Sequence, residues 1–244
     1  MRADEVTVVV PTYNERENLE ALVEAVLANG YRLLIVDDGS PDGTGSLADR
    51  LATAHQLLQV LHRPVKEGLG AAYVAGFEYA LAAGAQVICE MDADFSHDPT
   101  DLPRLVDAVA SGDADVAIGS RYVPGGSTPD WPFQRRVLSQ VGNLYVRLML
   151  GLRVRDATAG FRAYRSGSLA ELGAETCQAS GYGFQVELAW RATSRGLRIV
   201  EVPIVFRDRI YGESKMKGRI VSEAMWLVTK WGVQRRFGRN EDSR

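Results

Sequence analysis

The stretch VTVVVPTYNE, residues 6–15, decides how the rest of the chain is interpreted. Its first five residues are β-branched and mostly apolar, which favours a strand buried on both faces. Four further apolar runs follow, at 33–37, 57–61, 86–92 and 114–119. Because near-continuous apolar strands separated by helical segments are typical of parallel sheets, we expect a doubly wound α/β fold with three layers and helices on both faces.

The segments between these runs have the spacing of helices. Residues 18–29 and 68–84 carry apolar side chains at helical intervals, and Gly30 and Gly84 stand where helices commonly end. Further along, the alternation of strands and helices weakens. A loop containing glycine and proline leads there to an apolar helix, which we expect near 133–150.

Composition describes an ordinary globular protein, with 46% hydrophobic and 24% charged residues in a chain of 244. That length favours one large α/β domain with a short appendage. The net charge of −3 provides no case for nucleic acid as a partner. Cys89 and Cys177 lie far apart without metal-ligand spacing, which suits reduced thiols in a cytoplasm. The chain starts without an apolar leader and has no apolar run of about 18 residues, so we expect it in the cytoplasm.

Polar clusters follow three of the expected strands directly. The sequence PTYNE comes after the first strand, DDGSPDGT after the second and DADFSH after the fourth. In doubly wound sheets, ligands bind beyond the carboxyl ends of the strands. These three clusters are therefore expected to form one site.

Asp92 and Asp94 are the most informative pair in these clusters. Two carboxylates that approach one point repel each other unless a cation lies between them, and hard oxygen ligands in small number suit Mg²⁺ or Mn²⁺ with a substrate diphosphate. The alternative interpretation is a turn that leads into a helix. Asp38, in the second cluster, is able to accept hydrogen bonds from a nucleobase or ribose, or to belong to a turn rich in Asp and Gly. No dinucleotide-binding or P-loop glycine motif is present.

Eight stretches together resemble the family 2, GT-A glycosyltransferases. They are similar in particular to the dolichol-phosphate mannose synthases, called polyprenol monophosphomannose synthases in bacteria. The resemblance covers residues 6 to about 217 in the family's order, and DRIYGESK is the part specific to this branch. The stretches are VVVPTYNERENL, IVDDGSPDGT, KEGLGAAYVAGF, MDADFSHDP, GSRYVPGG, DATAGFRAYR, GYGFQVEL and VPIVFRDRIYGESK.

The resemblance implies a donor site for GDP-mannose. The residues it assigns to the nucleotide and sugar are Pro11, Tyr13, Glu15, Val36, Asp38, Asp92, Ala93, Asp94, Arg121, Arg209 and Lys215. It also implies that Asp92, Asp94 and Ser96 surround the metal, with Asp94 as the principal ligand. Family members often have Gln where this chain has Ser96, which leaves the exact coordination open.

The resemblance further implies inverting transfer of mannose to a polyprenyl phosphate, with Asp92, Asp94, Arg209 and Lys215 as the catalytic residues. Arg209 and Lys215 would neutralise the leaving diphosphate. A phosphate acceptor is already deprotonated near neutral pH, so no strong general base is required. The acceptor phosphate is expected at Arg121, Arg135 or Arg136.

Three other functions remain open at this point. A polyprenyl-phosphate glucosyl- or N-acetylhexosaminyl-transferase that uses a UDP-sugar would share the fold and the metal site. A nucleotidyltransferase would usually show a glycine-rich basic loop after the first strand, where this chain has PTYNERE. A binding subunit without activity is disfavoured because the acidic and basic motif residues are intact.

The last part of the chain is basic and carries an apolar, tryptophan-bearing segment. From Arg207 onward there are ten basic and five acidic residues. We expect a catalytic domain over 1–217 and a basic amphipathic helix over 218–244, which lies either at a membrane surface or against the domain. A peripheral position on the cytoplasmic face would reach the lipid acceptor, with a membrane-spanning protein as a candidate partner.

Overall fold

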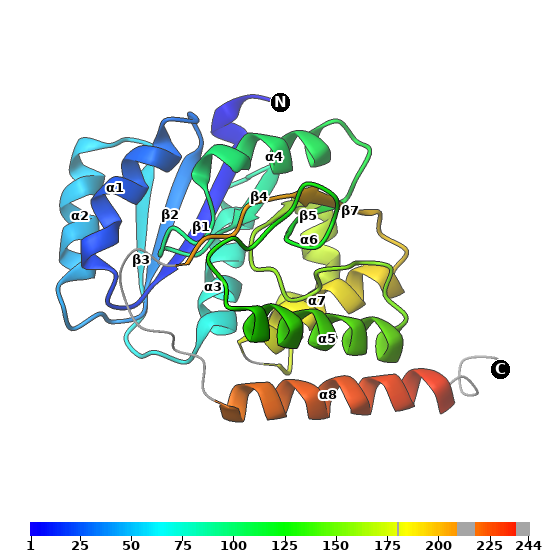
Figure 1. Cartoon of the computed structure of the whole chain (residues 1–244). Coiled ribbons are helices and arrows are strands. Elements are labelled where there is room, and N and C mark those ends of the chain that lie inside the picture. Colours follow the sequence, from blue (N-terminus) through cyan, green and yellow to red (C-terminus); the bar gives the residue numbers. More distant parts are fainter. Residues whose placement is uncertain (180, 209–217, 238–244) are drawn as a thin grey trace.

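The computed structural model describes residues 1–179, 181–208 and 218–237. Within these ranges the chain forms one sheet of seven strands in the order β3-β2-β1-β4-β6-β5-β7 (Figure 1). The strands are β1 Val6–Thr12, β2 Arg32–Asp37, β3 Leu58–His62, β4 Val87–Glu90, β5 Val116–Ser120, β6 Arg162–Arg165 and β7 Ile199–Pro203. The five strands expected from the apolar runs are β1 to β5.

The sheet is mostly parallel, as expected. Strands β1 to β4 form a parallel block, and β5 pairs with β7 in parallel. The exception is β6, which runs antiparallel between β4 and β5. Its sequence, RAYR, is too short and too basic to be recognised as a strand. The expected strand over 86–92 ends at Glu90, so Asp92 and Asp94 lie in the loop beyond it.

Helices cover both faces of the sheet, which confirms the three-layer arrangement. The helices α1, α2 and α4 pack on one face, and α3, α6 and α7 pack on the other. The α-helices are α1 Arg16–Leu27, α2 Thr44–Ala54, α3 Leu69–Ala82, α4 Leu102–Ala110, α5 Phe133–Leu150, α6 Ser166–Leu172, α7 Tyr182–Ser194 and α8 Gly218–Phe237. Short 3₁₀ turns lie at Ala3–Glu5, Pro99–Asp101 and Ala174–Thr176.

Helices α5 and α8 lie side by side outside α7, farther from the sheet (Figure 1). They share a small apolar core with α7, whose members are Val146, Leu150, Leu152, Ala157, Ala179, Val186, Ala189, Leu227, Val228 and Trp231. The ring of Trp231 stacks on that of Trp190 with 5.2 Å between centroids. One face of α8 therefore docks on the domain. None of the helices in the described part of the chain has the length and apolar character needed to cross a membrane.

Helix α3 lies very close to the sheet because it has glycine at its contact points. A Cβ atom at Gly76 would lie 2.3 Å from Cγ1 of Val9 on β1, and one at Gly70 would lie 3.1 Å from the ring of Phe184 on α7. Real Cβ atoms do not approach a packed valine so closely. Gly76 therefore sets how closely α3 approaches β1, and Gly70 sets how closely it approaches α7.

Two glycine-to-alanine variants should have opposite effects on stability. Gly76→Ala should lower the free energy of unfolding by about 1–3 kcal/mol, because Val9 belongs to the packed core. Gly142→Ala is the matched control, since Gly142 lies inside α5 with open space around its missing Cβ. It should raise stability by about 0.5–1 kcal/mol through helix propensity. Urea denaturation measures both, and equal stabilisation by the two variants would contradict the close packing of α3.

Candidate active site

The loops after β1 and β2 are joined through Asp37. Its carboxylate accepts hydrogen bonds from the hydroxyl of Thr12 at 3.2 Å and from the hydroxyl and amide of Ser40 at 2.5 and 3.1 Å. The hydroxyl of Ser40 in turn accepts from the amide of Asn14 at 3.0 Å. Asp37 thus organises the turn, and the next residue, Asp38, is left to face the site.

Asp38 is buried and paired with Arg63, which follows β3. The Nη1 atom of Arg63 lies 2.5 Å from Oδ1 of Asp38, and its Nη2 lies 2.5 Å from Glu67. Burial raises the pKa of Asp38, while the charges of Arg63 and Lys66 oppose that rise. Lys66 places its ammonium 3.5 Å from the ring centroid of Tyr13, in the geometry of a cation–π contact.

Arg63 and Lys66 are site residues that the sequence reasoning missed. They follow the third strand, whose carboxyl end lies at the same edge of the sheet as those of β1 and β2. The available signal was the position of RPVKEG directly after an expected strand. The sequence reasoning used only the polar clusters after the first, second and fourth strands, so these basic residues were overlooked.

The remaining residues that the resemblance assigns to the nucleotide lie at or just beyond the carboxyl ends of β1 and β2. Pro11 pairs with Val36 across β1 and β2, and Val36 packs its side chain into the core beneath α3. Glu15 accepts a hydrogen bond from Asn18 at 3.1 Å, and its amide donates to the hydroxyl of Thr44. Val36 therefore offers the site its backbone and not its side chain.

The acidic loop after β4 is held tightly by its own backbone and by α3. The amide of Ser96 donates to Oδ1 of Asp94 at 3.0 Å, and the hydroxyl of Tyr73 donates to Oδ1 of Asp92 at 3.2 Å. Asp94 and Ser96 are almost fully buried, and Ala93 packs into the core. Phe95 has a φ of 58°, an uncommon left-handed conformation for a phenylalanine.

His97 is part of the core, and it directly precedes the residue that caps the next helical turn. Its ring stacks on Phe161 with 4.9 Å between centroids, and its Nδ1 accepts from the amide of Asp92 at 3.4 Å. Burial lowers the pKa of His97 to about 4, so the imidazole is neutral at physiological pH. The residue that caps the following turn is Asp98, which accepts from the amide of Thr100.

A buried polar layer lies beneath the acidic loop. Glu90 accepts from the hydroxyl of Tyr164 at 2.7 Å and from Nε2 of Gln185 at 3.0 Å, and Nε of Arg162 lies 3.7 Å from it. Burial raises the pKa of Tyr73 and of Tyr164, so both hydroxyls keep their protons. Gln185, which lies in the motif stretch GYGFQVEL, is engaged in this layer.

Glu187 is also engaged in contacts that hold the fold together. Its carboxylate accepts from the amides of Gln178 and Ala179 and forms an ion pair with Arg191 at 2.6 Å. Arg191 also donates to the carbonyl oxygens of Leu172 and Gly173. Glu187 therefore ties α7 to the segment in front of it.

Arg121 does not extend freely into the site. Its guanidinium forms a bidentate pair with the fully buried Asp156, at 2.7 and 2.6 Å, and its Nη2 also donates to the hydroxyl of Thr158. The backbone amide of Arg121 donates to the same carboxylate at 2.9 Å. Most of the hydrogen-bonding capacity of Arg121 is thus used to hold the loop that carries Asp156.

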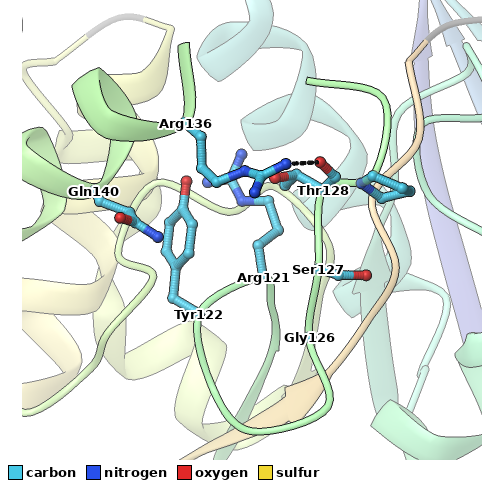
Figure 2. Close-up of a pocket in the computed structure, with 8 residues that line it drawn as sticks. Arg121, Tyr122, Gly126, Ser127, Thr128, Arg136 and Gln140 are labelled. Atoms are coloured by element: carbon cyan, nitrogen blue, oxygen red, sulfur yellow. Dashed lines mark hydrogen bonds between the residues drawn. The ribbon is translucent and has the colours of Figure 1, made fainter. Parts of the chain in front are cut away.

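A cavity of about 390 Å³ lies between Arg121 and the first turns of α5. Figure 2 shows Arg136 extending from α5 toward Thr128, with Tyr122 and Gln140 on the other side. Arg136 donates from Nη2 to the carbonyl oxygen of Thr128 at 3.2 Å, but its buried Nε has no hydrogen-bond partner among the described residues. A half-buried guanidinium that faces a cavity and has an unsatisfied Nε donor suits an anionic group.

Arg135 lies next to this cavity and makes other contacts. Its Nη1 is 2.7 Å from Oδ1 of Asp208, and its guanidinium lies 4.1 Å from the ring centroid of Trp131. The structure therefore separates the three arginines expected at the acceptor phosphate. Arg121 is paired with Asp156, Arg135 with Asp208, and Arg136 faces the cavity.

Arg209 and Lys215 lie outside the described residues. The chain that leads to Arg209 passes between the acidic loop and the entry of α5, because Arg207 donates its amide to Ser96 O at 3.2 Å and Phe206 to Ser127 O at 2.9 Å. The amide of Asp208 donates to Asp130 at 3.3 Å. Residues 206–208 thus lie beside both parts of the site.

Comparison with known proteins identifies the class that this fold and site define. Residues 7–173 match glycosyl transferase family 2, and the chain belongs to this family. It is therefore a glycosyltransferase, which confirms the resemblance found in the sequence.

The particular relatives are mannosyltransferases by name. The chain is 52% identical over 235 residues to the polyprenol monophosphomannose synthase of Mycolicibacterium smegmatis, covering 95% of this chain and 88% of that one. It is 50% identical over 236 residues to the undecaprenyl-phosphate mannosyltransferase of Micrococcus luteus, covering 95% and 96%. It is 36% identical to the dolichol-phosphate mannosyltransferase of Pyrococcus furiosus, covering 93% of this chain and 64% of that one.

Solved structures confirm the GT-A fold. The glucosyl-3-phosphoglycerate synthase of Mycobacterium tuberculosis, in complex with Mn²⁺, UDP and its product, superposes with a TM-score of 0.66 at 21% identity, covering 97% of this chain and 81% of that one. A mannosyltransferase of Pyrobaculum calidifontis, in complex with GDP-Man and Mn²⁺, superposes with a TM-score of 0.58 at 19% identity, covering 88% and 61%.

Removing Arg121 should damage the fold and not only the site. Arg121→Ala leaves the carboxylate of Asp156 buried without its cation, which should lower the free energy of unfolding by about 3–5 kcal/mol. The double variant Arg121→Met, Asp156→Asn removes both charges and should recover a large part of that loss. Urea denaturation measures both, and a loss below about 1 kcal/mol in Arg121→Ala would mean that the pair behaves like an exposed one.

Proposed function

We propose that this glycosyltransferase moves mannose from GDP-mannose to a polyprenyl phosphate, with inversion at the anomeric carbon and with a divalent metal ion. The observation that carries the proposal is the identity of 50–52%, over 95% of the chain, to two relatives named for mannose transfer to polyprenyl acceptors. The site supports it, because acidic, basic and aromatic side chains from four strand ends lie at one edge of the sheet.

The residues present suit a metal ion that shares its coordination with a diphosphate. Asp92, Asp94 and Ser96 offer hard oxygen atoms in one loop, and no group of three or more His, Cys, Asp or Glu side chains in the described chain is arranged to hold a metal by itself. Mg²⁺ and Mn²⁺ accept such partial protein sites and take their other ligands from substrate phosphates and water. When bound, the ion would neutralise charge on the diphosphate.

Asp38 is the residue best suited to recognise the base. Guanine presents the N1–H and N2–H groups side by side, and a carboxylate accepts both, whereas uracil presents only one N–H between two oxygen atoms. Arg63 holds one oxygen of Asp38 in place. The ring of Tyr13, which Lys66 already covers, would contribute to the nucleotide side of the site.

The chemistry needs positioning and charge neutralisation more than proton transfer. The phosphate oxygen of the acceptor attacks the anomeric carbon of mannose, the bond to GDP breaks, and the diphosphate leaves with an added negative charge. In this proposal Arg209 and Lys215 neutralise that charge together with the metal. The neutral, buried His97 is not required as a base.

The cavity beside α5 is the proposed site of the acceptor phosphate, with Arg136 as its principal contact. Arg136 has an unsatisfied buried donor, and Arg121 forms part of the cavity wall. Arg135 would join if the phosphate displaced Asp208 from it. A guanidinium is the side chain that most favours a phosphate, because its N–H groups match two phosphate oxygens.

The exposed face of α5 is the proposed contact with the membrane that holds the acceptor lipid. Phe133, Leu138 and Leu148 are 77%, 73% and 74% exposed. Val137, Val141 and Leu144 add to the same side, at helical spacing from Phe133. Single exposed apolar residues are ordinary, but six on one helix mark an interaction surface.

The positive charge of α5 favours an anionic lipid surface as the partner that binds this face. The sequence of α5 contains Arg135, Arg136 and Arg147 and no acidic residue. On the neighbouring α8, Trp226 is 62% exposed and Lys230 lies beside it, with Lys230 Nζ 5.4 Å from its ring centroid. Apolar and tryptophan side chains bordered by cations are typical of helices that lie in a membrane interface. The protein would then be peripheral, and the acceptor cavity begins on the same helix.

The first test measures donor use. The purified protein is incubated with Mg²⁺, a short polyprenyl phosphate and, in parallel, labelled GDP-mannose, UDP-glucose or UDP-N-acetylglucosamine, and label in the organic phase is counted. We expect transfer from GDP-mannose alone. Asp94→Ala should abolish it while the protein remains folded, because it removes the principal metal ligand. Transfer from a UDP-sugar would replace the substrate assignment, and near-normal activity of Asp94→Ala would remove the metal assignment.

The second test concerns the exposed face of α5. The triple variant Phe133→Ser, Leu138→Ser, Leu148→Ser should bind vesicles containing anionic lipid at least about tenfold more weakly, since each replaced side chain contributes free energy on insertion. Co-sedimentation with vesicles measures this. Tyr79→Ser, which removes an exposed aromatic side chain from α3, is the matched control and should bind normally. A wild-type dimer that the triple variant abolishes, without vesicle binding, would assign the face to a second copy.

A further inference from the structure

We infer that Tyr73 on α3 is a positioning residue for Asp92 and thereby sets the affinity of the site for metal and nucleotide. The inference rests on the proposed metal-dependent function and adds a residue to it. Tyr73 lies in KEGLGAAYVAGF, a stretch that belongs to the family resemblance. Its hydroxyl donates to Oδ1 of Asp92 at 3.2 Å, across 19 residues of sequence.

The position of the Tyr73 ring is determined from several sides. Gly70 and Gly76 allow α3 to approach the ring of Phe184 and the side chain of Val9, respectively. The ring of Tyr73 then lies 5.8 Å from that of Phe77, and it stacks parallel to Phe184 at 6.4 Å. A fully buried ring with aromatic neighbours has little freedom, so its hydroxyl marks a fixed point in the protein.

That fixed point restricts the side chain of Asp92. A carboxylate in a loop rotates about its last torsion, which is broad for aspartate. The hydrogen bond from Tyr73 to Oδ1 fixes the plane of the carboxylate, and with it the direction in which Oδ2 points. Hydrogen bonds that orient a metal ligand commonly change metal affinity by about 10–100-fold.

Tyr164 on β6 offers a matched control. It is also fully buried, and its hydroxyl donates at 2.7 Å to the carboxylate of Glu90, which lies two residues before Asp92. Both Tyr73→Phe and Tyr164→Phe remove one hydroxyl from a buried hydrogen bond to a carboxylate, so both should lower stability by similar amounts. They differ in whether the carboxylate lies in the proposed metal loop.

The experiment measures Mn²⁺ binding by the electron paramagnetic resonance signal of free Mn²⁺, in the presence of GDP or UDP. We expect Tyr73→Phe to weaken Mn²⁺ binding about 10–100-fold. Tyr164→Phe should bind Mn²⁺ like the wild type, and metal-free binding of the nucleotide should be unchanged in both. In an Asp92→Asn background, Tyr73→Phe should cause no further loss, because the two residues act through one contact.

The outcomes separate this inference from the proposed function. Normal Mn²⁺ binding by Tyr73→Phe, or equal losses in Tyr73→Phe and Tyr164→Phe, would overturn the positioning role while the metal site stands. An additive loss in the Asp92→Asn background would also overturn it. If the wild-type protein bound no Mn²⁺ with either nucleotide, the metal site of the proposed function would fail, and this inference with it.

Discussion

The buried ion pair between Glu90 and Arg162 is the interaction on which both halves of the site depend. Both side chains are fully buried, and Glu90 lies on β4, two residues before Asp92. Arg162 comes from β6 and donates to the carbonyl oxygens of Ala157 and Ala159. It therefore joins the strand that precedes the acidic loop to the loop that carries Asp156. A buried charge must be paired and hydrogen-bonded, so neither partner is able to move alone.

From this pair, fixed contacts extend to the cavity beside α5, which is the proposed acceptor site, and a similar arrangement is found on the proposed donor side. Asp156 holds Arg121, and Thr158 accepts from Arg121 and from Asn143 of α5. The wall of the cavity is thus connected to the centre of the sheet by hydrogen bonds between buried groups. On the donor side, Asp37 performs a similar task, because it fastens the loops after β1 and β2 to each other. In both halves, a buried carboxylate organises the backbone around the proposed site.

Much of the fold followed from local pattern. The apolar runs predicted β1 to β5, and the helix expected near 133–150 is α5, Phe133–Leu150. Strand β6 was not recognised, because RAYR has the composition of a solvated turn. It is a strand because its backbone pairs with β4 and β5, and Glu90 contacts Arg162 and the hydroxyl of Tyr164 inside the sheet. The sequence alone also did not decide whether α8 packs on the domain or lies at a membrane. In the structure one face of α8 packs on the domain, where Leu227, Val228 and Trp231 are buried, and Trp226 is exposed on another face.

The sequence by itself determined the class of the fold, the family and the acidic and basic motifs. The apolar runs of the strands, the polar residues that follow them and the order of the motifs are all visible along the chain without knowledge of the fold. Only the tertiary structure decided which side chains meet. Arg63 reaches Asp38, Tyr73 reaches Asp92 and Asp156 takes Arg121, across separations of 25, 19 and 35 residues. Such contacts depend on how closely a helix approaches the sheet and on which strand is inserted beside β4. Packing sets these distances, and no local pattern in the sequence records them.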